Sequence, residues 1–373
     1  MDNKLKNAIY IIILVAVCAV LALTVMMRST AQPLLPPPPT PEPTPTPTPI
    51  PTPTPVPTPT PEPEYFTISF IGDNTLSSGD GGERYNAILE NDMTRPFANT
   101  VKYFENDDLS IANFECIACD EWLYSDMMFH FRAPVANLQA LTNGGIDFVT
   151  TANNHIMDYG QEGLDKTLAA LDDAGIAYGT DGKPAIYETE SGLKVGIFCG
   201  YQHRSASEGA QAISELKAQG AEYIICAIHW GDEGKYRATD EQKNLGHALI
   251  DAGADLVYGS HPHVLEPIEE YGDGLILYSM GNWSFGGNAH PRDMDTAIVQ
   301  VTVKRDIDGS ISTDAHEVIP CRLSSTTEYN DYCPTPYEED SEDYKRVISK
   351  LDGSFDGSDL VVDYSFMFAE TGE

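Results

Sequence analysis

A proline-rich tract over residues 33–64 divides this chain and rules out a helix or a sheet there. It holds 17 of the chain's 26 prolines, mostly at every second residue and paired with threonine. Because proline lacks an amide donor and fixes φ, polyproline II is the ordered state left to such a segment. At about 3.1 Å per residue the tract reaches on the order of 100 Å. We therefore expect residues 28–64 to be a spacer and the folded domain to follow it.

The segment before the spacer has the composition of a membrane anchor. Ala8–Met27 is an uncharged apolar run of 20 residues, enough to cross a hydrocarbon core of about 30 Å. A cleaved signal peptide is the alternative, but its apolar region is usually only about 7–15 residues long, and Met26 and Met27 make a poor cleavage site. The cations Lys4 and Lys6 precede the run and only Arg28 closely follows it. We therefore predict a cytoplasmic segment 1–7, a retained single-pass anchor 8–27, and an extracellular remainder.

The charge balance removes one class of function. The chain has 22 Lys and Arg against 57 Asp and Glu, a formal net charge of −35. Binding of nucleic acid through a basic surface is excluded, and an anionic substrate would need metal ions or a local cationic pocket. Residues 65–335 can form one elaborate domain. We expect residues 336–373 to be an acidic, solvated C-terminal extension with one helix around Asp343–Leu351.

Six of the seven cysteines follow the spacer. In an extracellular domain, Cys321 and Cys333 could close a short loop, and so could Cys116 and Cys119. A zinc site of this type needs a second C-x-x-C pair, which the sequence lacks. Structural or unpaired thiols are therefore favoured over a metal role for these residues.

Apolar strand patterns alternate with helical patterns along the domain. This order predicts an α/β fold with two β-sheets and helices outside them. The expected strands are 66–71, 109–114, 146–151, 194–199, 223–228, 255–258, 275–278, 296–304 and 310–319, and the expected helices are 162–174 and 240–252.

Polar residues that suit a metal follow the carboxyl ends of several of these strands. In open α/β sheets those ends form the ligand crevice. A single histidine in such a place is usually a core residue, but seven candidate ligands in equivalent places indicate a site. They are Asp73, Glu115, Asn154, His155, His229, His261 and His263.

The chemistry of this set predicts a centre of one or two divalent transition metals. Imidazole, carboxylate and amide oxygen together suit Mn, Fe or Zn better than Ca. His261 and His263 are two residues apart, so an extended segment would point both rings to one side. Glu115 is the candidate bridging carboxylate. Two ions about 3.5–4 Å apart would polarise a phosphoryl oxygen and lower the pKa of a bridging water.

Two residues are candidates for catalysis and one for substrate binding. His155 could protonate a leaving group if a carboxylate held its other nitrogen, and Asp158 is the nearest candidate for that. Arg132 could meet an anionic substrate or be paired with a carboxylate.

The order of these motifs resembles the CapA family of poly-γ-glutamate capsule biosynthesis proteins, a branch of the calcineurin-like metallophosphatases. The resemblance covers about Tyr65–Phe285 and rests on the segments IGDN (71–74), NFE (113–115), FHFRAP (129–134), TANNHIMDYGQEGL (151–164), IHWGDE (228–233), AGADLVYGSHPHV (252–264) and YSMGNWSF (278–285). It implies an αββα sandwich of two mixed sheets flanked by helices. It also implies a membrane-anchored protein facing outside, with other poly-γ-glutamate synthase subunits as partners.

The metallophosphatase pattern, carried over by position, implies roles for the same residues. It makes Asp73 the first-motif ligand and Glu115 the bridge, with His155 as the acid. The remaining ligands it implies are Asn154, His229, His261 and His263. The sequence departs from the pattern at Thr75, where calcineurin-like enzymes have a histidine, and at Glu115, where they have an aspartate.

Three functions remain open from the sequence. One is a CapA-like surface protein for the synthesis, export or anchoring of poly-γ-glutamate, with a metal-dependent, hydrolase-like site. Another is an extracytoplasmic metallophosphoesterase that acts on nucleotides or wall phosphates. The last is a non-catalytic subunit of a polymer synthase or export complex.

Overall fold

The structure is a computed structural model that describes residues 62–78, 84–201, 204–286 and 289–362. The chain divides into two compact units, residues 1–59 and 60–373, and all described residues belong to the second unit.

The predicted N-terminal segments lie outside the described residues. These are the cytoplasmic segment 1–7, the anchor 8–27, and residues 28–61 of the spacer 28–64. They stay predictions. Among the helices that the structure does describe, none is long and apolar enough to cross a membrane.

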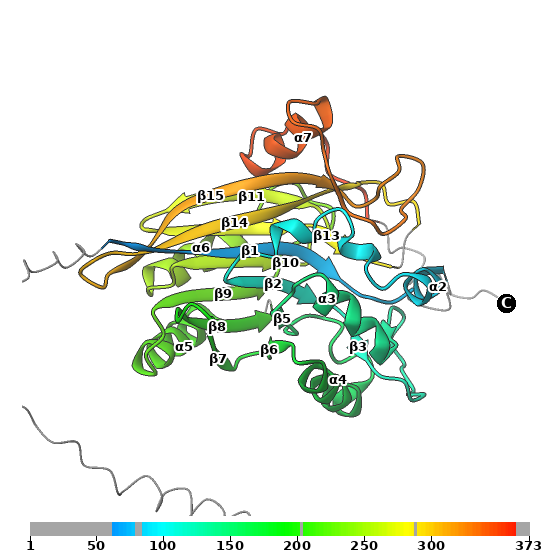
Figure 1. Ribbon diagram of the computed structural model, residues 1–373, viewed down its shortest axis with the longest axis horizontal. Helices are drawn as coiled ribbons and strands as arrows, with labels where there is room; N and C mark the ends of the chain where they lie inside the picture. The colour runs from blue at the N-terminus through cyan, green and yellow to red at the C-terminus, as the bar shows by residue number, and fades with distance from the viewer. Residues whose placement is uncertain (1–61, 79–83, 202–203, 287–288, 363–373) are drawn as a thin grey trace, which may run out of the picture. The chain divides into compact units, whose positions relative to one another are not determined.

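Two mixed β-sheets form the body of the second unit (Figure 1). The strands of the first sheet are β1 (Glu64–Asn74), β2 (Leu109–Phe114), β5 (Phe148–Thr150), β6 (Ala177–Gly179), β13 (Asn282–Ser284), β14 (Asp295–Arg305), β15 (Ile311–Arg322) and β16 (Thr335–Pro336). Their order is β16-β15-β14-β1-β2-β5-β6, with β13 beside β1. Strands β1, β2, β5 and β6 are parallel, whereas β14 is antiparallel to β1.

The second sheet has six strands in the order β11-β12-β10-β9-β8-β7. They are β7 (Pro184–Glu188), β8 (Lys194–Tyr201), β9 (Tyr223–His229), β10 (Leu256–Ser260), β11 (Leu265–Tyr271) and β12 (Gly274–Met280). The four central strands are parallel, and the two edge strands are antiparallel to their neighbours. Every residue of β9 is buried, as expected for a parallel strand covered on both faces.

Helices and short segments complete the described part. The helices are α2 (Arg84–Asn91), α3 (Gln139–Asn143), α4 (Gly160–Ala174), α5 (Ala206–Ala218), α6 (Asp240–Asp251) and α7 (Glu342–Leu351). A two-stranded ladder pairs β3 (Ile117–Ala118) with β4 (Arg132–Ala133). Local sequence sets several helix ends. Ser205 with Glu208 and Thr239 with Gln242 form capping boxes that begin α5 and α6. Gly175, with φ of 72°, ends α4.

Three buried clusters show how these layers pack. One cluster joins the two sheets, with Phe70 of β1 and Tyr258 of β10 among its members. A second packs α4 through Leu171 against the outer face of the first sheet. A third packs α5 and α6, through residues such as Leu216 and Leu249, against the outer face of the second sheet. The result is a mixed α/β fold with mixed sheets between helices, consistent with the metallophosphatase-like fold expected from the sequence.

The expectation of a solvated C-terminal appendage is wrong for the described residues. The helix is present as α7, close to its predicted bounds. However, Val347 and Leu351 are buried and belong to the cluster that joins the sheets. These two side chains are four residues apart, so they share the face of α7 that packs against the domain.

All six cysteines of the described residues are free and buried. Neither of the disulfides that their spacing allowed is present.

Candidate metal centre

Both sheets carry their candidate ligands to one edge. Asp73 lies near the end of β1, Glu115 follows β2, and Asn154 follows β5, all on parallel strands of the first sheet. His229 ends β9, and His261 and His263 follow β10, its parallel neighbour in the second sheet. Because parallel strands end at the same edge, the six side chains meet where the sequence predicted a crevice.

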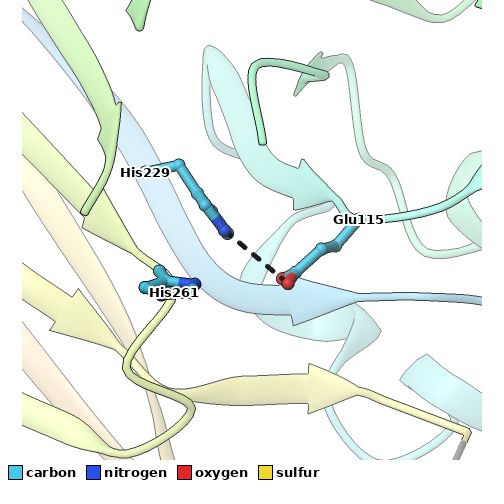
Figure 2. A group of neighbouring side chains, drawn as sticks. All are labelled: Glu115, His229 and His261. Atoms are coloured by element: carbon cyan, nitrogen blue, oxygen red, sulfur yellow. Dashed lines mark ion pairs between the residues drawn. The ribbon is translucent and has the colours of Figure 1, made fainter. Parts of the chain in front are cut away.

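Two groups of candidate ligand atoms share the carboxylate of Glu115. One contains Glu115, His229 and His261, which approach one another from different strands (Figure 2). The other contains Asp73, Glu115 and His263. Within each group the ligand atoms lie within 4.8 Å of one another. Glu115 is therefore the residue common to both groups, as a bridging ligand would have to be.

The distances and unused atoms in this cluster fit a divalent metal. Glu115 Oε1 lies 3.7 Å from His229 Nε2 and 3.8 Å from His263 Nε2, which is beyond hydrogen-bond distance. This buried oxygen has no hydrogen-bond partner, and neither has Nδ1 of His261. Buried polar atoms without partners are costly, and a divalent ion bound among these side chains would offer them one.

The electrostatics of the cluster also favour a cation. Burial and the neighbouring Asp73 raise the pKa of the Glu115 carboxyl well above its usual range. Burial and the neighbouring His263 lower the pKa of His261 to about 4, so this imidazole is neutral and ready to ligate. Burial opposes protonation of His263, but the Glu115 and Asp73 carboxylates outweigh it and raise its pKa to about 10. Positive charge is therefore stabilised where the two carboxylates meet.

We had expected the segment that carries His261 and His263 to be extended, and this expectation is wrong. Both residues have positive φ, 104° for His261 and 56° for His263. The chain bends here because it leaves β10 and must enter β11, and both rings still reach the cluster. Positive φ in a non-glycine residue costs about 1–3 kcal/mol, and such strain is concentrated at functional sites.

Asn154 and His229 are directly in contact. Asn154 Oδ1 lies 2.7 Å from His229 Nε2, so the two atoms are hydrogen-bonded to each other. The other ring nitrogen of His229, Nδ1, lies 2.8 Å from the hydroxyl oxygen of Ser260. A partner of this kind fixes the ring orientation of a metal-binding histidine.

His155 and Asp158 form the predicted pair. His155 Nδ1 donates to Asp158 Oδ2 over 2.9 Å, and the same oxygen accepts the amide of Phe131 over 2.8 Å. The ring of Phe131 lies edge-on to the His155 ring, with centroids 4.5 Å apart. This arrangement fixes the imidazole ring of His155 through Nδ1.

Arg132 has backbone partners in the structure. Its Nη1 donates to the carbonyl of Glu121 over 2.8 Å and to that of Cys119 over 3.4 Å. These bonds hold the segment between β3 and β4. A role for Arg132 in substrate binding stays a prediction.

Thr75, where calcineurin-like enzymes have a histidine, makes structural hydrogen bonds. It is fully buried, its hydroxyl accepts the amide of Gly286 over 3.0 Å, and it donates to the carbonyl of Ser77 over 3.3 Å. These bonds join the end of β1 to the segment after β13.

Three residues of the site escaped the sequence analysis. Asn113 Nδ2 donates to Asp73 Oδ1 over 2.9 Å and to Glu115 Oε2 over 3.0 Å, between two like charges. Asn282 Oδ1 lies 3.0 Å from His263 Nδ1, and Glu233 forms a further candidate group with His261 and His263. Two-residue alternation places Asn113 on the face of Glu115, which was a usable signal. Asn282 and Glu233 carried no comparable signal.

Comparison with known proteins identifies the family. The family model for the bacterial capsule synthesis protein PGA_cap matches residues 67–286, which include every candidate ligand named above. The chain belongs to the PGA_cap family.

Individual relatives of this PGA_cap chain have names that agree with the family. The PGA biosynthesis protein CapA of Bacillus subtilis is 31% identical over 66% of this chain and 68% of its own. The capsule biosynthesis protein CapA of Bacillus anthracis is 29% identical over 55% of this chain and 56% of its own. A probable polyglutamine synthesis accessory protein of Mycobacterium tuberculosis is 26% identical over 51% of this chain and 60% of its own. Among solved structures, the NAD nucleotidase of Haemophilus influenzae aligns at a TM-score of 0.43, with 13% identity over 78% of this chain and 56% of that one.

Proposed function

We propose that this protein is an extracytoplasmic accessory protein of poly-γ-glutamate capsule production, held at the cell surface by its predicted anchor. It works in synthesis, export or anchoring of the polymer, together with other subunits of the synthesis machinery. We further propose that its site binds one or two divalent transition metals and is hydrolase-like. Family membership supports the first statement, and the geometry of the site supports the second.

One observation carries the proposed metal site. The unpartnered, buried Oε1 atom of Glu115 faces histidine nitrogens on both sides, and each side is part of a separate ligand group. His229, His261 and Asn154 would hold one ion, Asp73 and His263 would hold the other, and Glu115 would serve both. None of the candidate ligand groups among the described residues contains a thiol, so the donor set is nitrogen and oxygen, which suits Mn, Fe or Zn.

The chain's own residues supply the rest of the chemistry. A bound metal of this class polarises an ester or amide oxygen and generates a nucleophile from water near neutral pH. Asp158 holds His155 by Nδ1, so that Nε2 can deliver a proton to a leaving group. Asn113 holds the Asp73 and Glu115 side chains in position by donating a hydrogen bond to each. Ser260 orients the ring of His229.

A non-catalytic assembly role is the second candidate, and Thr75 favours it. Calcineurin-like enzymes have a histidine ligand at this position, whereas the hydroxyl of Thr75 makes two structural hydrogen bonds here. One metal position then has fewer ligands. A protein of this kind would use the metal centre to keep its shape and would hold partner subunits.

The test separates metal binding from catalysis. Metal content of the full-length protein, purified in detergent, is measured for the wild type and for Glu115→Gln, His155→Ala and Glu188→Gln. We expect one or two transition metals per chain, retained in His155→Ala and reduced in Glu115→Gln. Glu188 is an exposed carboxylate of β7 paired with Lys194, and Glu188→Gln is the control that should not change.

Polymer production in the host is then measured with the same variants. Loss of production in both Glu115→Gln and His155→Ala supports a hydrolase-like role, because removing a proton donor typically costs 10²–10⁴ in rate. Normal production in His155→Ala together with loss in Glu115→Gln supports the assembly role. Absence of bound metal in the wild type would overturn the metal centre.

A further inference from the structure

The segment between β3 and β4, residues 119–131, exposes a cluster of large apolar side chains. Of the eleven large hydrophobic residues that are exposed in the described part of the chain, five lie within this segment. They are Trp122 (77% exposed), Tyr124 (72%), Met127 (50%), Met128 (49%) and Phe129 (41%), and we call them the apolar loop. In Figure 1 this segment projects from the body of the domain beside α4. None of the five is among the candidate metal ligands.

Polar contacts hold the backbone of this segment in place. Ser125 Oγ donates to the carbonyl of Asp158 over 2.6 Å, and the amide of Val135 donates to Asp120 Oδ1 over 2.9 Å. Arg132 closes the base of the loop through the carbonyl of Glu121, as described above. The apolar side chains are therefore exposed on a fixed framework. A preorganised surface of this kind loses little conformational entropy when a partner binds.

The size and composition of the apolar loop suit the centre of a protein interface. Aromatic side chains bury about 150–250 Å² each, so three of them, exposed as above, offer on the order of 400 Å². That is about half of one partner's share, roughly 800 Å², in an interface of standard size. Tryptophan, tyrosine and methionine are also the residues enriched at the buried centres of such interfaces.

The charges around the apolar loop select the kind of partner. Asp120, Glu121 and Asp126 are all exposed on the same segment, and Asp126 lies between Tyr124 and Met127. Insertion into a bilayer would bring this carboxylate to the headgroups, and a chain of net charge −35 is repelled by anionic lipid. A second copy of this chain would bring the same carboxylates into contact with their equivalents.

We propose that the apolar loop docks a different protein, whose complementary surface is an apolar hollow edged by lysine or arginine. The inference goes beyond the proposed metal centre and does not depend on it. The partner would bind next to His155 and Asp158, because Phe131 at the end of the segment contacts both residues.

Photo-crosslinking in the host cell tests the docking surface. A photo-crosslinking amino acid replaces Met128 in the full-length protein, and a matched control places it at Ile307, which is 66% exposed in the turn after β14. We expect a discrete adduct with a second protein at position 128 only. The adduct should be lost when Trp122→Ser and Tyr124→Ser are added, although the unfolding transition of the purified variant is unchanged.

The partner identified in the adduct is then purified and titrated against the full-length protein. Trp122 reports binding directly, because the chain's other two tryptophans, Trp230 and Trp283, are buried. We expect a shift in its fluorescence, and we expect Asp126→Lys to weaken binding at least tenfold because it reverses a charge that faces the basic edge. Equal affinity of Asp126→Lys would overturn the proposed charge complementarity.

Three other outcomes would overturn the docking proposal. Absence of an adduct at position 128 would show that no protein binds this surface. An adduct containing only a second copy of this chain would make it a self-association surface. Quenching of Trp122 in phosphatidylcholine vesicles with brominated acyl chains, after reconstitution of the full-length protein, would make it a membrane contact.

Discussion

Asp73 and Glu115 are both fully buried, and at the scale of single residues burial of Glu115, followed by the proximity of Asp73, is the main electrostatic cost of the site. Asn113 donates to both carboxylates, and His263 lies 3.2 Å from Asp73. These contacts offset the repulsion only in part, since the pKa of Glu115 remains well above its usual range through burial and the charge of Asp73. A cation bound between the carboxylates would remove the remaining cost.

Two glutamates of β11 should respond to pH with opposite signs. Burial raises the pKa of Glu266 to about 8, so the folded state keeps a proton that the unfolded state releases above about pH 4.5. The stability that this group contributes is complete below pH 4.5 and is lost as the pH rises through 8. Glu266→Gln should therefore stabilise the protein at pH 7.5, by about 2 kcal/mol, and have little effect at pH 4.5.

Glu269 is the matched control for that measurement. Burial alone would raise its pKa, but hydrogen bonds from Tyr278 and His247 outweigh burial and lower it. Its stabilising contribution is present above the unfolded pKa and is lost as the pH falls, so Glu269→Gln should destabilise the protein at pH 7.5. Urea unfolding at both pH values checks the pair, and the same sign for both variants would contradict the assignment.

At the scale of elements, the segment after α7 supports the loop that carries Glu233. The amide of Leu360 donates to the carbonyl of Gly234 over 2.9 Å, and the amide of Gly234 donates to the carbonyl of Pro262 over 2.8 Å. Pro262 lies between His261 and His263. The C-terminal segment is thus connected through two backbone hydrogen bonds to the strained turn that holds two candidate ligands.

Two lysines of α7 should differ strongly in their effect on stability. Lys350 is 2% exposed and its Nζ lies 2.7 Å from both Asp293 and Asp295. Lys350→Met removes the ammonium group that pairs with Asp293 and Asp295. It should lower the free energy of unfolding by about 3 kcal/mol. Lys345 is exposed and pairs only with Glu342, so Lys345→Met should change stability little. Equal urea midpoints for the two variants would refute the structural role of Lys350.

At the scale of the whole domain, the candidate site exists only where the two sheets meet. The candidate ligands Asp73, Glu115 and Asn154 come from the first sheet, and the three candidate histidine ligands come from the second. The hydroxyl of Tyr258 in β10 donates to the carbonyl of Ile71 in β1 over 2.6 Å, two residues before Asp73. This buried bond connects the two halves of the ligand set.

Tyr258→Phe should therefore weaken metal binding as well as stability. Loss of one buried hydrogen bond costs about 1–2 kcal/mol, and a misplaced ligand set should lower metal affinity roughly tenfold. Tyr223→Phe is the control, because Tyr223 also bonds across the sheets, to Thr313 over 2.7 Å, but at the start of β9 and away from the site. It should lose similar stability and keep its metal affinity, as measured by competition with a chromogenic chelator. Equal loss of affinity in both variants would contradict a local role for Tyr258.

The sequence by itself determined nine of the strands, most of their bounds and the polar residues that follow several of them. It did not predict the strands β3, β4, β6, β7, β11, β13 and β16 or the helices α2, α3 and α5. Local periodicity carries this information, because burial on both faces demands continuous apolar strands and parallel strands end at a common edge. The contact between His155 and Asp158 was also predictable from local sequence, because the two residues are only three positions apart.

Only the tertiary structure decided which strands are neighbours, and therefore which candidate ligands lie beside Glu115. The positive φ of His261 and His263, the contribution of Glu233, and the packing of α7 against the sheets all depend on contacts between segments far apart in the chain. Local patterns state which face of an element is apolar, but not which partner covers it. The acidic composition of the C-terminal segment therefore led us to predict that it is solvated, although Val347 and Leu351 belong to the core between the sheets.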